Sequence, residues 1–226
     1  GRFWSKKRTS GFLQNNWRRS EPNPKKRSSD CENAPWRSGK RFFALKTKRN
    51  DGHKYIPELY ARGVRNFVVT DVPEQLSHYA DANFLQVGNT LKALQRLAAK
   101  HREQFQVPVV GITGSNGKTV VKEWIYQLLS PEKVITRSPR SYNSQIGVPL
   151  SVWMMNEHTE LGIFEAGISE MGEMEALQPI IQPTIGVLTN IGWAHQENFS
   201  SLQDKCMEKL QLFKDCDVII YNGDNE

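Results

Sequence analysis

From residue 107 to the end of the chain, short apolar runs alternate with longer segments that have the pattern of helices. The apolar runs predict strands at "VPVVGIT", "KVITR", "LGIFEAG", "TIGVLTNI" and "DVIIY". The segments between them predict helices at "KTVVKEWIYQLL", "IGVPLSVWMM", "EMEALQPI" and "SLQDKCMEKLQLF". Strands and helices that alternate at this spacing are joined by right-handed crossovers. The sequence therefore predicts an α/β domain with a doubly wound, mainly parallel sheet that is incomplete at its C-terminus.

A smaller α/β domain is predicted upstream, over residues 42–106. Its strands are expected at "FFAL", "NFVVT" and "FLQV". The segment "YIPELYARG" predicts a helix that ends at Gly63. A second helix, "NTLKALQRLAAKHREQF", places its leucines on one face, and Asn89 or Thr90 is the expected N-cap. We place the domain boundary near residues 106–108, so that the second domain covers residues 107–226.

Residues 1–41 form a basic segment unlike the rest of the chain. It holds 12 of the 30 Lys and Arg residues and only 3 of the 24 Asp and Glu residues. Tryptophans among these basic residues are compatible with an arm that binds nucleic acid, by phosphate neutralisation and base stacking. The segment has neither a helical nor a strand period, which favours a disordered segment instead.

The composition indicates the class of protein and its compartment. The chain is 38% hydrophobic, which is typical of a globular protein. No apolar run approaches the ~20 residues of a membrane-spanning helix, and the N-terminus lacks the apolar core of a secretory signal. The three cysteines, Cys31, Cys206 and Cys216, form no C-x-x-C pair. This pattern predicts reduced thiols in a cytoplasmic protein.

The stretch "GITGSNGKT", residues 111–119, lies between a predicted buried strand and a predicted helix. Such a loop presents successive backbone N–H groups to an anion, and the helix dipole adds partial positive charge. Gly114 and Gly117 permit a close approach, Lys118 can reach the β- and γ-phosphates, and the Thr119 hydroxyl can bind Mg²⁺. The alternative is an ordinary glycine-rich turn. Ile112 stands where the common phosphate-loop pattern has glycine, which argues against a simple kinase or GTPase.

Three further candidates lie at or after the predicted strands, where doubly wound sheets bind ligands. Glu165 ends the strand "LGIFE" and is either a metal ligand or a helix cap. His195 follows the strand "TIGVLT", and a lone histidine is more often structural than a ligand. Lys209 lies in a predicted helix, where a solvated lysine is the ordinary interpretation.

The motifs "GITGSNGKT", "YNSQIGVPLS", "FEAGISEMGEM", "LTNIGWAHQENF" and "EKLQLF" resemble, in order and spacing, the central domain of the Mur ligases. These are ATP-dependent, amide-forming enzymes of peptidoglycan synthesis in the bacterial cytoplasm. The upstream stretch "FFALKTKRNDGHKYIPELYARGVRNFVV" is similar to the N-terminal, UDP-substrate domain of the branch that adds D-Ala-D-Ala. The stretch "SPRSYNSQIGVPLSVW" is most similar to the versions of that branch that are fused to an alanine racemase domain. The resemblance covers residues 42–226.

The resemblance implies roles for individual residues. It implies a second Mg²⁺ on His195 and on a CO₂-derived carbamate of Lys209, and a partly structural role for "DGH", residues 51–53. The implied catalytic residues are Lys118, Lys209 and His195. Thr119 and Glu165 would hold the first Mg²⁺, and Asn143 and Gln145 would seat the UDP-sugar peptide. The residues implied to bind ATP are Gly114, Ser115, Asn116, Gly117, Lys118, Thr119 and Asn190.

The implied reaction joins D-Ala-D-Ala to UDP-MurNAc-tripeptide through an acyl phosphate, with ATP and Mg²⁺ as cofactors. A related enzyme of the same superfamily, folylpolyglutamate synthase, is the alternative ligase, and the "DGH" element argues against it. Two departures from the pattern stand out. Residues 1–41 lack the Ser/Thr-Asp-Ser-Arg type of element expected near the uridine site, and the chain ends before the C-terminal ligase domain. We therefore expect this piece to bind ATP without ligating.

Overall fold

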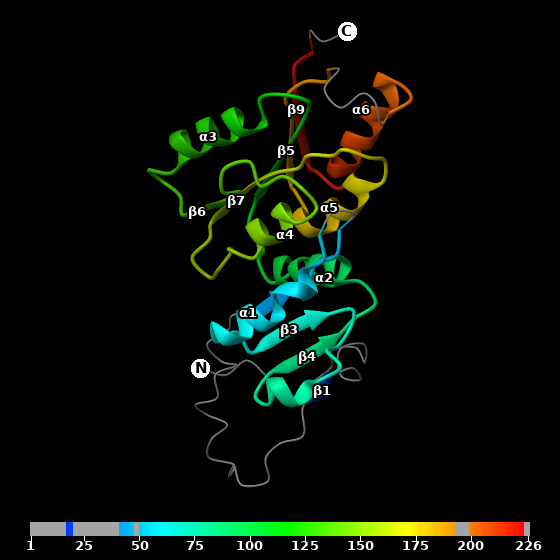
Figure 1. Ribbon diagram of the computed structural model, residues 1–226. Helices are drawn as coiled ribbons and strands as arrows, with labels where there is room; N and C mark the ends of the chain where they lie inside the picture. Colours follow the sequence, from blue (N-terminus) through cyan, green and yellow to red (C-terminus); the bar gives the residue numbers. More distant parts are fainter. Residues whose placement is uncertain (1–16, 20–40, 48–49, 193–198, 224–226) are drawn as a thin grey trace. The chain divides into compact units, whose positions relative to one another are not determined.

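The computed structural model describes residues 17–19, 41–47, 50–192 and 199–223. The chain divides into two compact units, Gly1–Ala93 and Leu94–Glu226 (Figure 1). Helix α2 (Thr90–Arg102) runs across the division. The domain limits expected from the sequence, residues 42–106 and 107–226, stay a prediction.

The first unit contains a mixed four-stranded sheet with the order β1-β4-β3-β2. Strands β2, β3 and β4 are parallel and confirm the three strands predicted here, whereas β1 pairs antiparallel with β4. Strand β1 lies inside the segment predicted to be disordered, and that prediction did not anticipate it. The rest of residues 1–40 lies outside the described part of the chain. The bounds are β1 Trp17–Arg19, β2 Arg41–Phe43, β3 Asn66–Val69 and β4 Asn83–Gln86.

Local contacts define the helices of this unit. Helix α1 (Ile56–Ala61) is followed by Gly63, whose φ of +89° stops the helix as expected. The Asn89 side chain accepts from the Lys92 N–H at 2.9 Å, so Asn89 is the N-cap of α2. Two short 3₁₀ segments, η3 (Gly52–Tyr55) and η4 (Leu76–Tyr79), complete the unit. Phe67 and Phe84 stack at 5.2 Å in its core.

The "DGH" element holds two segments of this unit together. Asp51 caps η3 by accepting from the His53 N–H at 3.0 Å, and it also contacts the His53 ring at 2.6 Å. The other ring nitrogen accepts from the Thr70 N–H at 3.0 Å, just beyond β3. A Cβ on Gly52 would lie 2.8 Å from the Leu45 backbone nitrogen. These contacts support the structural role that was expected for residues 51–53.

The second unit contains a fully parallel five-stranded sheet with the order β6-β7-β5-β8-β9 (Figure 1). This confirms the doubly wound, parallel sheet. Strand β5 is central: the chain first builds β6 and β7 on one side of it and then β8 and β9 on the other. The topological switch point, where such sheets bind ligands, is therefore at the end of β5. The bounds are β5 Val109–Thr113, β6 Ile135–Arg137, β7 Leu161–Glu165, β8 Ile185–Leu188 and β9 Val218–Tyr221.

Helices cover both faces of this sheet, and alternation along the strands sorts the core into two clusters. Val110 and Ile112 face α3, while Val109 faces α4, α5 and η6. Helix α6 precedes η6 and is joined to it directly. The bounds are α3 Lys118–Leu129, α4 Gly147–Val152, α5 Glu173–Ile181, α6 Leu202–Leu210 and η6 Gln211–Phe213.

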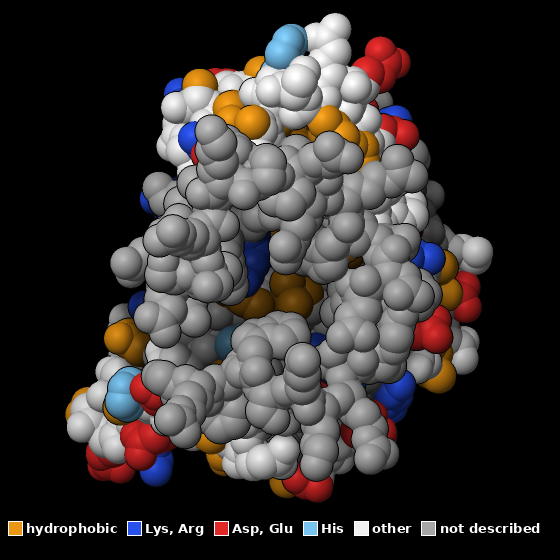
Figure 2. All heavy atoms as spheres, turned by 90° about the horizontal axis from the view of Figure 1, so that it is seen from below, with side chains coloured by type: hydrophobic (Ala, Val, Ile, Leu, Met, Phe, Trp, Pro, Cys, Tyr) orange, Lys and Arg blue, Asp and Glu red, His pale blue; other side chains and the backbone are white. Residues whose placement is uncertain are grey.

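Charged side chains of both signs lie on the surface of the described residues (Figure 2). Figure 2 shows one face of the molecule, on which described acidic, basic and apolar side chains lie near one another. Most of the basic segment lies outside the described ranges. Within those ranges no helix combines the length and the apolar character that crossing a membrane requires.

Candidate active site

The glycine loop occupies the switch point, between the end of β5 and the start of α3. Gly114 has a φ of +141° and Gly117 a φ of +80°, backbone conformations that side chains with a Cβ rarely adopt. A Cβ on Gly114 would lie 2.0 Å from Thr189 Oγ1 and 3.0 Å from the backbone of Asn190. The loop thus depends on glycine, and it leads directly into the positive end of the α3 dipole.

The segment after β8 supports the glycine loop through a set of short hydrogen bonds. The Ser115 N–H donates to the Asn190 carbonyl at 2.9 Å, and the Asn116 N–H donates to Asn190 Oδ1 at 3.0 Å. The Thr189 hydroxyl donates to the Asn116 carbonyl at 2.6 Å. Asn190 therefore fixes the shape of the loop. Its expected approach to a nucleotide stays a prediction.

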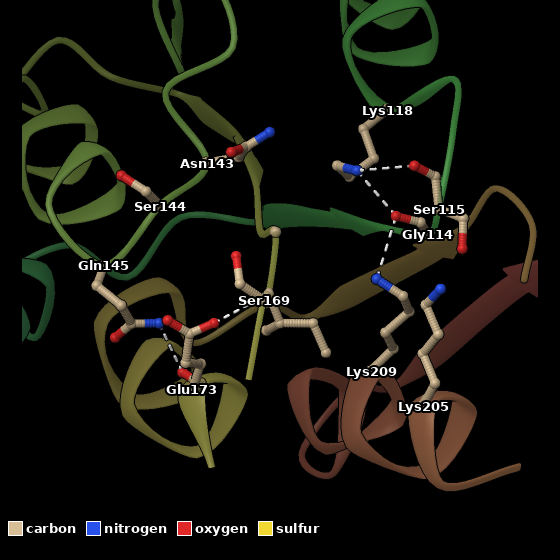
Figure 3. A pocket seen from close by; sticks show the side chains of 12 residues that line it. Gly114, Ser115, Lys118, Asn143, Ser144, Gln145, Ser169, Glu173, Lys205 and Lys209 are labelled. Atoms are coloured by element: carbon tan, nitrogen blue, oxygen red, sulfur yellow. Dashed lines mark hydrogen bonds between the residues drawn. The ribbon is translucent and has the colours of Figure 1, made fainter. Parts of the chain in front are cut away.

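Three lysines line one side of a cavity of about 140 Å³ beside this loop (Figure 3). Lys118 and Lys209 donate to the same carbonyl, that of Gly114, at 2.8 and 3.2 Å. Lys205 donates to the Gly192 carbonyl at 2.6 Å. The opposite side carries polar side chains from the segments after β6 and β7. The lining residues are Gly114, Ser115, Lys118, Asn143, Ser144, Gln145, Gly167, Ile168, Ser169, Glu173, Lys205 and Lys209.

The cavity is electrostatically suited to a polyanion. Burial lowers the pKa of Lys118, although Glu165 partly opposes this shift. Burial, together with the charges of Lys118 and Lys205, lowers the pKa of Lys209 from an ordinary 10.5 to about 8. Ammonium groups that burial and mutual repulsion destabilise gain the most from a bound phosphate.

We expect Lys209→Met to stabilise the protein at neutral pH. Because the folded-state pKa of Lys209 lies near 8, the unfolded chain binds more protons between about pH 8 and 10.5. The cost of the buried ammonium is fully present below pH 8 and disappears as the pH rises through that window. The variant should therefore gain about 3 kcal/mol in free energy of unfolding at pH 7 and nothing at pH 11.

Denaturant unfolding of the wild-type chain and of Lys209→Met, from pH 7 to 11 in CO₂-free buffer, measures this difference. Lys214→Met, which replaces an exposed lysine close by, is the control and should give a pH-independent difference. A Lys209→Met variant that is less stable than wild type at pH 7 would contradict the prediction.

Glu165 and Thr119 form an oxygen pair behind the glycine loop. Glu165 ends β7 and is fully buried; its Oε2 accepts from the Thr119 hydroxyl at 3.0 Å and from Asn143 Nδ2 at 3.5 Å. A carboxylate and a hydroxyl this close provide the oxygen ligands that Mg²⁺ prefers. No group of three or more His, Cys, Asp and Glu side chains suited to a metal occurs among the described residues. A bound Mg²⁺ would therefore take its remaining ligands from phosphate and water, as nucleotide-bound Mg²⁺ usually does.

The structure brings most of the predicted site residues together. Gly114, Ser115 and Lys118 line the cavity, and so do Asn143, Gln145 and Lys209. The other predicted residues lie beside the cavity. Thr119 donates to Glu165, Asn116 donates to Asn190, and Gly117 is the N-cap of α3. Gln145 donates to the Glu173 carbonyl at 2.9 Å and accepts from Gln95 at 2.8 Å. His195 falls in residues 193–198, outside the described part of the chain.

Sequence reasoning missed three site residues: Lys122, Lys205 and Glu173. Lys205 precedes Lys209 by four residues, a spacing that places both on one helix face and that could have identified it. Lys122 likewise follows Lys118 by four residues, but a lysine in an amphipathic helix is ordinarily solvated, and the sequence does not indicate that this one is completely buried.

A parallel sheet with a glycine loop at its switch point and a lysine-lined cavity beside it defines a nucleotide-binding protein of the phosphate-loop class. Comparison with known families makes this specific. The Mur ligase middle domain matches residues 112–226, and the Mur ligase family, catalytic domain, matches residues 36–102. The chain belongs to the Mur ligase family.

Individual relatives are UDP-N-acetylmuramoyl-tripeptide–D-alanyl-D-alanine ligases. The Bacillus subtilis enzyme is 35% identical over 188 residues, which cover 81% of this chain and 40% of the relative. The Synechocystis enzyme is 39% identical over 158 residues, which cover 70% of this chain and 34% of the relative. The chain thus spans about two fifths of the length of such relatives.

Solved structures agree with the sequence comparison. The MurF structure from Acinetobacter baumannii superposes with a TM-score of 0.76 at 29% identity, over 83% of this chain and 41% of that one. The MurF ligase from Thermotoga maritima in complex with ADP superposes with a TM-score of 0.73 at 29% identity, over 82% of this chain and 43% of that one. This agreement confirms the mixed α/β fold in both units.

Proposed function

We propose that this chain provides the UDP-substrate unit and the ATP-binding unit of a ligase that joins D-Ala-D-Ala to UDP-MurNAc-tripeptide. The observation that carries the proposal is the cavity beside the glycine loop. In it, Lys118 and Lys209 converge on the Gly114 carbonyl, opposite Asn143 and Gln145. The names of the relatives support this pair of substrates over a folate. A cytoplasmic location and fusion to an alanine racemase domain stay predictions.

The first step activates a carboxylate, which is a poor acyl donor. A carboxylate oxygen of the tripeptide attacks the γ-phosphorus of ATP, the bond from that phosphorus to the ADP oxygen breaks, and an acyl phosphate and ADP result. Because this step brings anions together, the chain contributes mainly position and positive charge. Lys118 and the N–H groups at the start of α3 would hold the phosphates, while Asn143 and Gln145 would orient the acyl substrate.

The second step forms the amide. The amine of D-Ala-D-Ala attacks the acyl carbon, loses a proton, and phosphate leaves with the electrons of the carbon–oxygen bond. Bound Mg²⁺ would supply further positive charge at the phosphate oxygens. Thr119 and Glu165 are the residues that would hold it, and the family resemblance adds His195 and a carbamate on Lys209 for a second ion.

The environment of Lys209 supports the proposed carbamate. Only a neutral amine attacks CO₂, and a pKa of about 8 leaves about a quarter of the Lys209 side chains neutral at pH 7.5. A lysine with a pKa of 10.5 would be neutral in about one chain in a thousand at that pH. The conversion of this ammonium to an anion would also relieve its repulsion with Lys118 and Lys205.

A chimeric enzyme tests the proposed function. Residues 42–226 would replace the matching segment of the Bacillus subtilis relative, and pentapeptide product would be followed by mass spectrometry with phosphate release. We expect turnover that requires ATP, Mg²⁺, UDP-MurNAc-tripeptide and D-Ala-D-Ala together. The same chimera with Lys209→Met is the matched control and should show no turnover. A folded chimera that binds ADP but consumes ATP with a folate instead would overturn the choice of substrate.

A further inference from the structure

Lys122 is a completely buried lysine on the inner side of α3, one turn beyond the glycine loop. Its ammonium lies 2.9 Å from Glu165 Oε1, and Glu165 is also completely buried. Glu165 Oε2 accepts from Thr119, so the two carboxylate oxygens have different partners. Lys122 thus holds one oxygen of Glu165 by charge, in an ion pair without hydrogen-bond geometry, and leaves the other beside the hydroxyl with which it would share a metal ion.

The same ammonium also holds the segment after β6. Lys122 donates to the Ser138 carbonyl at 2.8 Å and to the Arg140 carbonyl. Arg140 has a φ of +49°, a left-handed conformation that is unfavourable for a residue with a Cβ. A strained residue of this kind persists only when neighbouring contacts determine it. The segment continues into Asn143 and Gln145, which line the cavity.

One side chain therefore connects three parts of the site: the helix after the glycine loop, the carboxylate at the end of β7 and the cavity-lining segment after β6. We propose that Lys122 is a positioning residue that orients Glu165 for Mg²⁺ and fixes the segment 138–145 for the acyl substrate. The inference rests on the proposed function, which it extends by a residue that touches neither substrate. Residues that orient a metal ligand in this way typically contribute about 10- to 100-fold to metal affinity.

Calorimetric titration of ADP into the 226-residue chain, once with Mg²⁺ and once with EDTA, tests the inference. The ratio of the two affinities measures how well the site holds Mg²⁺ with the nucleotide. We expect Lys122→Met to reduce this ratio about tenfold and to change the affinity in EDTA by less than about threefold. A purely structural role would weaken ADP binding equally in both buffers.

Two further variants separate positioning from loss of stability. Leu177→Ala creates a cavity in the core beneath α5, far along the chain from these contacts, and should lower the Tm while it keeps the wild-type ratio. Lys122→Gln can still donate to the Ser138 carbonyl but has no charge to hold Glu165. It should reduce the ratio of the ADP affinities in Mg²⁺ and in EDTA about tenfold, as Lys122→Met does. If the Lys122→Met variant does not fold, Lys122→Gln takes its place in the test.

The outcomes distinguish the inference from the proposed function. A wild-type chain that binds no ADP in either buffer would overturn both. A wild-type chain that binds ADP more tightly with Mg²⁺, together with Lys122 variants that keep this advantage within about twofold, would overturn the inference alone.

Discussion

The Lys118→Met variant should bind ADP about 100-fold more weakly than the wild-type chain. The Lys118 ammonium lines the cavity and now donates to the carbonyls of Gly114 and Ser115. A phosphate offers it a charged partner in place of these neutral ones. Hydrogen bonds between charged groups contribute about 1.5–3 kcal/mol each, and 2.8 kcal/mol corresponds to about 100-fold in affinity. Titration calorimetry with ADP in Mg²⁺ measures the change.

Lys100→Met is the control for this prediction, because it removes a lysine of α2 that is 75% exposed and paired with Glu103. Its ADP affinity should equal that of the wild-type chain. The Tm of Lys118→Met should not fall, since burial makes its charge unfavourable in the absence of a ligand. Wild-type affinity in the Lys118→Met variant would mean that the nucleotide binds elsewhere.

The Gly114→Ala variant should lose both stability and nucleotide binding. Its Cβ would lie 2.0 Å from Thr189 Oγ1 and 3.0 Å from backbone atoms of Asn190, and the φ of +141° is itself unfavourable for alanine. The loop must therefore shift away from the segment that supports it. We expect a loss of about 2 kcal/mol in free energy of unfolding and at least about 30-fold in ADP affinity.

Gly192→Ala is the matched control, because Gly192 lies in the supporting segment and, apart from its chain neighbours, a Cβ there would come no closer than 3.8 Å to any atom of the described residues. Chemical denaturation and ADP titration of the two variants should show a large effect for Gly114→Ala and almost none for Gly192→Ala. Equal effects would indicate that the general environment matters and that the conformation at Gly114 does not.

The sequence predicted the second unit well because its signals are local. Alternating apolar runs and amphipathic segments placed every strand of the parallel sheet, and the glycine loop was expected where β5 ends. Helix α4 is shorter than predicted: it ends at Val152, and the N–H groups of Met154 and Met155 bond to carbonyls three residues back. This tightening buries Met155 in the core, a tertiary effect that helical periodicity does not reveal.

The candidate site could be predicted only in part. The glycine loop was predicted from its own residues, because its glycines and lysine between a strand and a helix have a recognisable chemistry. Glu165 was left open between a metal ligand and a helix cap, and Lys209 was singled out only by the family resemblance. The buried ion pair of Lys122 with Glu165 was missed because it joins residues 43 positions apart, on a helix and a strand whose packing the sequence does not specify. Strand β1 was missed for a similar reason, since its pairing with β4 is entirely long-range.

The most direct test of the central claim is to follow the backbone amide resonances of the 226-residue chain by NMR while Mg²⁺ and ADP are added. The N–H signals of residues 114–119 should shift most, in a saturable way. The side-chain signals of Lys118 and Lys209 should change at the same concentrations. Saturable binding that leaves residues 114–119 unperturbed would contradict the assignment of this loop as the phosphate site.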